Sequence, residues 1–202
     1  MRSCFRAVIP VIASVALAAC TVFPTPDAPR VMDLGSVESV PRLETRHSQT
    51  LRVDTPLASE PVNGTRILTK PTPHEFQMYG SARWRDSAPV LIRDHLIDTL
   101  RRSQGFANVV TDTSAASTDL TLISELSAFQ AETIEGKTRV VIELHAEMLN
   151  NRSRKSLCVR NSRLSQPAAS GTLDAVVEAF ANTADQLGKE TLLWAHQCLA
   201  EN

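Results

Sequence analysis

The chain has 202 residues, long enough for one domain with a sizeable core, and its 21 basic and 22 acidic side chains leave a net charge of −1. No basic patch interleaved with aromatic residues is present, which argues against a nucleic-acid-binding protein. After Cys20, no stretch approaches the roughly 18 consecutive apolar residues that indicate a membrane-spanning helix.

The N-terminus has the pattern of a secretory signal peptide, with two arginines followed by an apolar stretch that is too short to span a membrane. It ends in Leu17-Ala18-Ala19-Cys20, which resembles the bacterial lipoprotein signal. In that class the cysteine is acylated, with palmitate among the acyl groups, and becomes the first residue of the mature protein. The alternative is a plain signal peptide with an incidental cysteine. We predict a signal peptide over residues 1–19 and a lipid anchor at Cys20.

The segment after the cysteine indicates where the anchored protein resides. Thr21 stands where aspartate retains many Gram-negative lipoproteins on the inner membrane, so the class rule implies the outer membrane, facing the periplasm. Residues 20–30 contain three prolines and no amphipathic pattern, which predicts a semi-extended tether of about 30 Å. The folded domain is expected over residues 31–202.

The first part of the domain reads as short strands followed by a helix. Strands are predicted at 31–34, 50–57, 65–69 and 74–79, with a loop over 36–48 and a turn at 70–73. Ser87 is a good N-cap, and Pro89 falls within the first turn of a helix whose apolar stripe runs to Leu100. Gly105 is the expected terminator of this helix.

The second part contains the clearest strand signals. Extended runs are predicted at 106–110, 120–131, 140–149 and 157–164, with Glu135-Gly136 at a hairpin tip. Gly171-Thr172 opens a long helix whose apolar positions recur at three- and four-residue steps as far as Cys198. The sequence therefore predicts one α+β domain, a mostly antiparallel mixed sheet with one middle helix and one long C-terminal helix packed on it.

Two cysteines remain once Cys4 is removed with the signal and Cys20 is acylated. Cys158 and Cys198 would lie in an oxidising compartment, where a bridge between them would close a loop of about 40 residues and contribute about 4 kcal/mol. The alternative is two separate buried thiols. Their wide separation lacks the paired spacing of zinc sites, so no metal is predicted.

Catalytic signatures are missing from the sequence. There is no nucleophile elbow, no zinc-protease motif, no phosphate-binding glycine loop and no dinucleotide fingerprint. Glu143 and Glu147 on one strand would lie about 13 Å apart, too far for a glycosidase pair. We predict a protein that is not an enzyme and needs no cofactor. The five histidines are isolated from one another and are expected at the surface or at strand edges: His47, His74, His95, His145 and His196.

The segment between residues 76 and 89 is unusual, because two amphipathic aromatic residues precede a helix that begins near a proline. Such a pair serves either as a core clamp or as a partner hot spot. Tyr79, Trp84 and Pro89, spaced five apart, resemble the signature of the ABC-type transport auxiliary lipoproteins, the group that includes paraquat-inducible protein C. The opening at residues 28–35 and the terminal helix with Trp194 agree, although the tyrosine-arginine pair that many members carry after residues 66–70 is absent.

The resemblance implies a role beside a transporter. Members act with an ABC transporter that carries an MCE (mammalian-cell-entry) domain protein and moves phospholipids or other hydrophobic molecules. The resemblance implies that this chain docks against the MCE component, either alone or as a ring of identical subunits. Tyr79, Trp84 and Pro89 would shape the corner that faces the partner. The alternative is a periplasmic lipoprotein that itself cradles a lipid or small apolar ligand in a closed cavity under the terminal helix.

Overall fold

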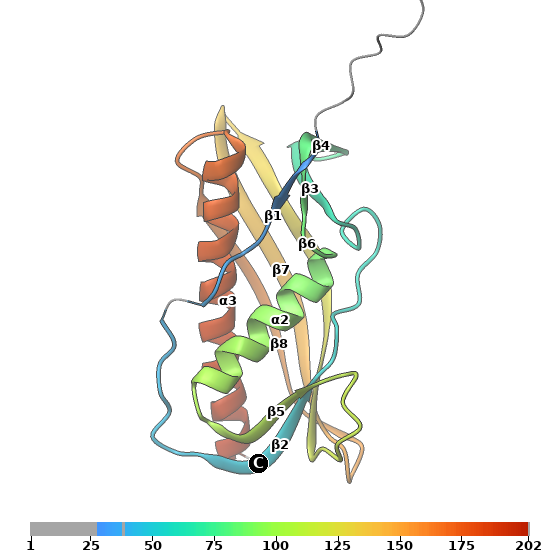
Figure 1. The fold of residues 1–202 in the computed structure, drawn as a ribbon. Coiled ribbons are helices and arrows are strands. Elements are labelled where there is room, and N and C mark those ends of the chain that lie inside the picture. The colour runs from blue at the N-terminus through green and yellow to red at the C-terminus, as the bar shows by residue number, and fades with distance from the viewer. Residues whose placement is uncertain (1–27, 38, 202) are drawn as a thin grey trace, which may run out of the picture.

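The computed structural model describes residues 28–37 and 39–201, in which eight strands and two helices are present (Figure 1). The predicted signal peptide and the predicted anchor at Cys20 lie outside these residues. The elements in chain order are β1 Arg30–Met32, β2 His47–Val53, β3 Arg66–Thr72, β4 Glu75–Trp84, α2 Ala88–Arg102, β5 Phe106–Thr111, β6 Leu120–Ile134, β7 Lys137–Asn150, β8 Lys155–Pro167 and α3 Leu173–Glu201.

All eight described strands belong to one curled mixed sheet built around β6. One edge of β6 pairs with β7 along its whole length, and β7 pairs in turn with β8. The other edge is shared, because β2 pairs with the first part of β6 and β3 pairs with its last part. The β3–β4, β6–β7 and β7–β8 ladders are antiparallel, whereas the shorter β1–β4, β2–β5, β2–β6 and β3–β6 ladders are parallel. The predicted α+β class is confirmed.

A bulge in β6 lets this 15-residue strand serve the core along its length. The register with β7 shifts between Leu126 and Ala128, which leaves Ser127 as the extra, exposed residue. A bulge bends the strand and changes which residues face inward. Leu122 and Leu126 before the shift, and Phe129 and Ala131 after it, are therefore all buried.

Both helices cover the same face of the sheet, with α3 running along the molecule and α2 crossing in front of it (Figure 1). The two helices touch where α3 carries Gly188, because a Cβ atom there would lie 2.6 Å from Thr99 Oγ1 of α2. The glycine thus permits a close approach that no larger residue would allow. Thr99 is fully buried and donates a hydrogen bond to the His95 carbonyl, 2.9 Å away.

The start of α2 agrees with the prediction, and its end differs. Ser87 is the N-cap residue and Pro89 lies in the first turn. The helix ends at Arg102, and the left-handed residue that follows is Gln104, at φ 57°, instead of Gly105. Gly105 has another role, because a Cβ atom there would lie 2.5 Å from the Leu43 side chain.

Most strand boundaries differ from the sequence prediction by a few residues, and β2 begins at His47, inside the loop predicted over 36–48. The β3–β4 turn lies after Thr72, and β4 continues to Trp84, because its register with β3 shifts by three residues between Met78 and Arg83 and breaks the alternation. β2 ends at Val53, and Leu57 makes only an isolated bridge to β6 while its side chain is 73% exposed.

The elongated molecule has two ends that we name by their contents (Figure 1). The hairpin end contains the β3–β4 and β6–β7 turns, which adjoin because β3 pairs with β6 at Thr69 and Lys70. The disulfide end contains the β7–β8 turn and the last turns of α3.

Candidate functional site

The corner where β4 leads into α2 holds three segments together through backbone hydrogen bonds. The Trp84 amide donates to the Thr65 carbonyl at 2.7 Å, and the Arg85 amide donates to Met32 of β1 at 2.8 Å. One turn later the Ala88 amide donates to the Gly64 carbonyl at 3.1 Å. The corner is therefore a junction of β1, the loop before β3, β4 and α2.

Trp84 is the central core residue of this corner. Its side chain has no exposed surface, and its ring centroid lies 5.2 Å from that of Phe180 on α3 and 5.5 Å from that of Phe129 on β6. Pro89 is also buried. Because neither residue reaches the surface, their direct contribution is to the packing between helix and sheet.

Tyr79 lies on β4, five residues before Trp84, and is half-buried. Its hydroxyl is 3.5 Å from the Gly171 carbonyl, just before α3, and burial raises the pKa of the phenol. The structure thus brings Tyr79 to the start of α3 and Trp84 to Phe180, the eighth of its 29 residues. The three spaced residues line one seam between sheet and helices without forming a common surface.

The same aromatic packing bears on the cavity expected by the alternative hypothesis. Trp84, Phe129 and Phe180 fill the space between α3 and the sheet, with ring centroids of the two phenylalanines 4.6 Å apart. The grooves described for the molecule are open at the surface. The two largest, of about 480 and 460 Å³, are lined by the 60–66 loop with β3 and β4, and by β5 with the end of α2.

His95 corrects the expectation that the histidines lie at the surface or at edges. It points from α2 towards α3, is 5% exposed, and places Nε2 2.9 Å from the Asp185 carboxylate without the alignment of a hydrogen bond. Burial lowers its pKa, and the charge of Asp185 opposes that effect. The helical pattern placed His95 among charged residues, but the crossing of α3 buries it.

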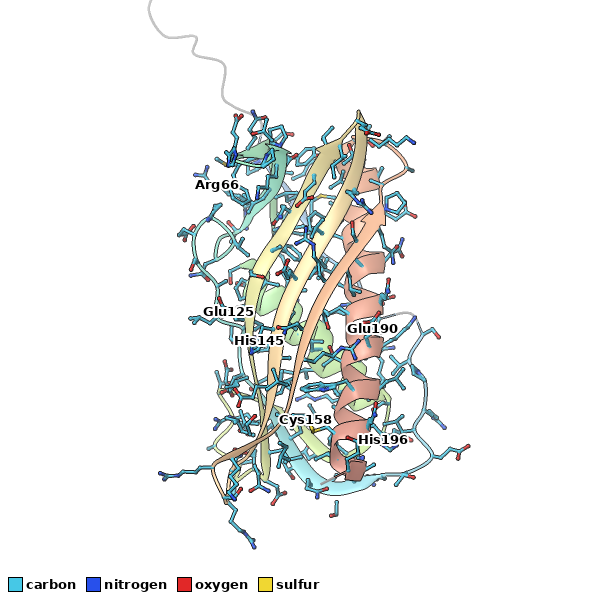
Figure 2. The ribbon with its side chains drawn as sticks, turned by 180° about the vertical axis from the view of Figure 1, so that it is seen from behind. Arg66, Glu125, His145, Cys158, Glu190 and His196 are labelled. Atoms are coloured by element: carbon cyan, nitrogen blue, oxygen red, sulfur yellow. A yellow bond between two sulfur atoms is a disulfide. The ribbon has the colours of Figure 1, made fainter. Side chains whose placement is uncertain are left out.

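His47 and His196 are brought together at the disulfide end although 149 residues separate them. His47 Nε2 lies 2.8 Å from His196 Nδ1, so one ring donates to the other. Burial, followed by the charge of His196, lowers the pKa of His47. Figure 2 shows His196 on the last turns of α3, close to Cys158 on β8.

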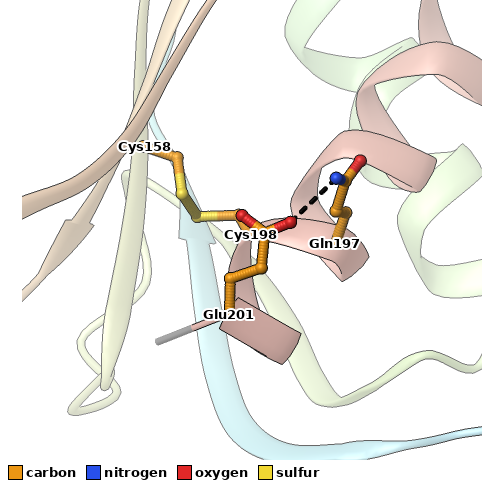
Figure 3. Close-up of a disulfide and its surroundings, with 4 residues drawn as sticks. All are labelled: Cys158, Gln197, Cys198 and Glu201. Atoms are coloured by element: carbon orange, nitrogen blue, oxygen red, sulfur yellow. Dashed lines mark hydrogen bonds between the residues drawn. A yellow bond between two sulfur atoms is a disulfide. The ribbon is translucent and has the colours of Figure 1, made fainter.

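Cys158 and Cys198 form a disulfide, with their Cα atoms 6.0 Å apart (Figure 3). The bond joins β8 to the last turns of α3, where Gln197 donates to the Glu201 carboxylate at 2.8 Å. The C-terminal helix is thereby fixed covalently to the edge strand of the sheet.

Exposed apolar side chains gather at the hairpin end. Phe76 and Met78 of β4 are 40% and 48% exposed, and Ile134 at the end of β6 is 50% exposed. The first two fall within the segment that the sequence marked as unusual. Ile134 was missed, although its position next to the Glu135-Gly136 turn could have indicated an apolar residue at a tip.

The described residues offer little for metal binding or membrane crossing by helices. Nowhere among residues 28–37 and 39–201 do three or more His, Cys, Asp or Glu side chains gather so as to hold a metal ion. Neither helix in this part of the chain has the length and apolar content that a membrane crossing requires.

Comparison with known proteins gives a family match and a shared fold. A family model described as the ABC-type transport auxiliary lipoprotein component matches residues 34–191. The solved structure of protein XCC0632 from Xanthomonas campestris is similar, with 23% identity, a TM-score of 0.77, and coverage of 85% of this chain and 97% of that one. The hypothetical protein CT253 from Chlamydia trachomatis has 8% identity, a TM-score of 0.55, and coverage of 77% and 99%. No curated protein matches the sequence.

Proposed function

The chain belongs to the family of ABC-type transport auxiliary lipoprotein components, and we propose that it is the lipid-anchored docking component of a system that moves phospholipids or other hydrophobic molecules across the cell envelope. The match of the family model over residues 34–191 carries this proposal. The chain docks to the MCE-domain protein of the transporter, and the ATPase and permease are separate chains. Its own contribution is to hold the partner in place.

The anchor in this proposal is the acylated Cys20. A single acyl chain binds a membrane only marginally, whereas two or more hold firmly, so the several chains of a lipoprotein make release negligible. Thr21 after the cysteine favours the outer membrane, with the domain facing the periplasm.

A docking component must be rigid enough to hold its partner at a fixed place, and the packing of the described residues supports such a role. The Trp84 corner joins β1, β4 and α2, and the Cys158–Cys198 bond joins α3 to β8. The domain is thus held together at the Trp84 corner and at the disulfide end. Several copies around one partner, as a ring, would give the MCE protein a fixed collar.

Crosslinking in intact cells tests the proposal. The full-length protein should capture an MCE-domain protein, and loss of the protein should raise sensitivity to detergents. Cys20→Ser should abolish both capture and barrier function, while Cys4→Ser, which alters the other N-terminal cysteine, should leave them unchanged. A normal barrier without the protein, together with no captured MCE protein, would contradict the proposal. Lipid retained by the deacylated protein would favour the direct-binding alternative.

A further inference from the structure

The hairpin end exposes apolar side chains beside a groove. Phe76 and Met78 of β4 and Ile134 at the end of β6 are exposed there, and a groove of about 190 Å³ lies between residues 70–73 and 132–134. Towards the disulfide end, Val159 of β8 and Leu193 of α3 are exposed singly on separate elements. The β7–β8 turn at the disulfide end exposes Arg152, Ser153 and Arg154. Because burial of apolar surface is favourable, exposure of three large apolar side chains at one end indicates a surface that is covered in use.

The chain enters the fold at a point that directs its N-terminal segment towards the hairpin end. β1 begins at Arg30 and runs parallel to β4, with Arg30 level with Ala82. Because β4 starts at the hairpin end, residues 28 and 29, the first two that the structure describes, lie on that side of β1. Arg30 itself is fixed beside the start of α3 by an ion pair with Asp174 at 2.6 Å.

The reach of the tether decides which end can meet the membrane. Ten residues lead from Cys20 to Arg30, and even fully extended they span at most about 35 Å. Arg30 itself lies at the hairpin end, because its partner Asp174 is in the first turn of α3, which begins there (Figure 1). The disulfide end lies further away in the other direction, since the 29 residues of α3 make it about 43 Å long. The tether therefore reaches past the hairpin end and cannot bring the disulfide end to the same plane.

From these observations we infer that the hairpin end rests in the interface of the lipid bilayer, with Phe76, Met78 and Ile134 buried among the lipid headgroups. The inference rests on the proposed anchor at Cys20. The anchor holds the three side chains at a high effective concentration beside the bilayer, so a small apolar area suffices for contact.

Charged side chains of both signs surround these apolar ones. Lys70 and Lys137 lie near Glu75 and Glu135 in the two hairpins, and the Arg66 guanidinium contacts the Met78 sulfur at 2.6 Å. The Lys70 ammonium lies 5.2 Å from the centre of the Phe76 ring. A lysine in this position can keep its charge at the headgroups while its stem and the ring enter the apolar layer.

Depth-dependent fluorescence quenching tests the contact. Single cysteines replace Met78, Ile134, Leu57 or Ser153 in the full-length acylated protein, each is labelled with an environment-sensitive dye, and the proteins are reconstituted in phosphatidylcholine vesicles that contain spin-labelled lipid. Cys158 and Cys198 are bonded to each other and do not take the dye. Dyes at residues 78 and 134 should lose at least half of their emission. Dyes at residue 57, midway along the sheet, and at residue 153, at the disulfide end, should be unaffected.

The outcomes separate this inference from the anchor on which it rests. Quenching at residues 78 and 134 alone supports the contact. Protein that floats with the vesicles but shows no quenching overturns the contact while the anchor stands, and leaves the hairpin end to a protein partner. Equal quenching at residue 57 overturns it as well, since the body then lies flat. Protein that neither floats nor carries acyl mass at Cys20 overturns the anchor and the contact together.

Discussion

The indole of Trp84 makes the core sensitive to a single substitution. It contacts Phe129 and Phe180, and its Nε1 atom has no hydrogen-bond partner among the described residues. Trp84→Ala should lower the free energy of unfolding by about 3–5 kcal/mol, measured by urea denaturation. Trp84→Phe should cost clearly less, because it keeps a ring in place and removes a buried, unpaired N–H group. Equal losses for the two variants would show that the aromatic contacts contribute little.

The buried histidines should make the protein less stable in mild acid. The pKa values of His47 and His95 are lowered by burial from the ordinary 6.5, so the unfolded chain takes up these protons first as the pH falls. These two histidines should therefore not change the free energy of unfolding above about pH 7. They should lower it as the pH drops below 6.5.

Substitution of His47 provides the test of this dependence. His47→Gln should make the fall in unfolding free energy between about pH 7 and pH 5 shallower, as urea titrations at several pH values would show. His74→Gln, which changes an exposed histidine in the β3–β4 turn, is the matched control. A slope that His47→Gln does not alter would mean that the His47–His196 pair is not linked to folding.

At the scale of elements, the disulfide joins the last helix to an edge strand. Replacing both Cys158 and Cys198 with Ser should lower the free energy of unfolding by up to about 4 kcal/mol, since the bond closes a loop with a sequence separation of 40. Reductant should destabilise the wild-type protein by a similar amount and have no effect on the double variant. An unchanged midpoint in reductant would show that packing alone holds α3.

The contact between the two helices depends on Gly188. Gly188→Ala adds helix propensity worth about 1 kcal/mol, but its Cβ atom would press on Thr99, which is buried and cannot move aside. We expect a net loss of about 1–2 kcal/mol by urea denaturation. The double variant with Thr99→Ala should recover stability relative to Gly188→Ala, whereas Gly80→Ala, which meets no atom within 4 Å, should show no such coupling.

The elements themselves could be predicted from the sequence because their signals are local. Alternation marks β7, Glu135 and Gly136 mark its hairpin, and helical periodicity marks α2 and α3. The pairing of strands could not be predicted in this way, since β6 takes β2 on one part of its edge and β3 on another. The bulge at Ser127 likewise depends on the partner strand and not on the residue type.

The environments of single residues show the same contrast between local signals, which the sequence reveals, and long-range contacts, which it does not. The stripe of α2 explains Leu96 and Leu100 in the core, but His95 is buried only because α3 crosses above it. The approach of His47 to His196 joins the second strand to the last helix, and no spacing in the sequence indicates it. Prediction from sequence thus reached the framework of the candidate surfaces and missed the contacts that long-range packing creates.

At the scale of the whole molecule, the tether and the long axis together define an orientation. The ion pair of Arg30 with Asp174 and the pairing of β1 with β4 fix the point where the tether meets the domain. That point lies at the hairpin end, where α3 begins (Figure 1). If this end rests on the bilayer, the disulfide end with its basic β7–β8 turn faces the periplasm and is open to the transporter.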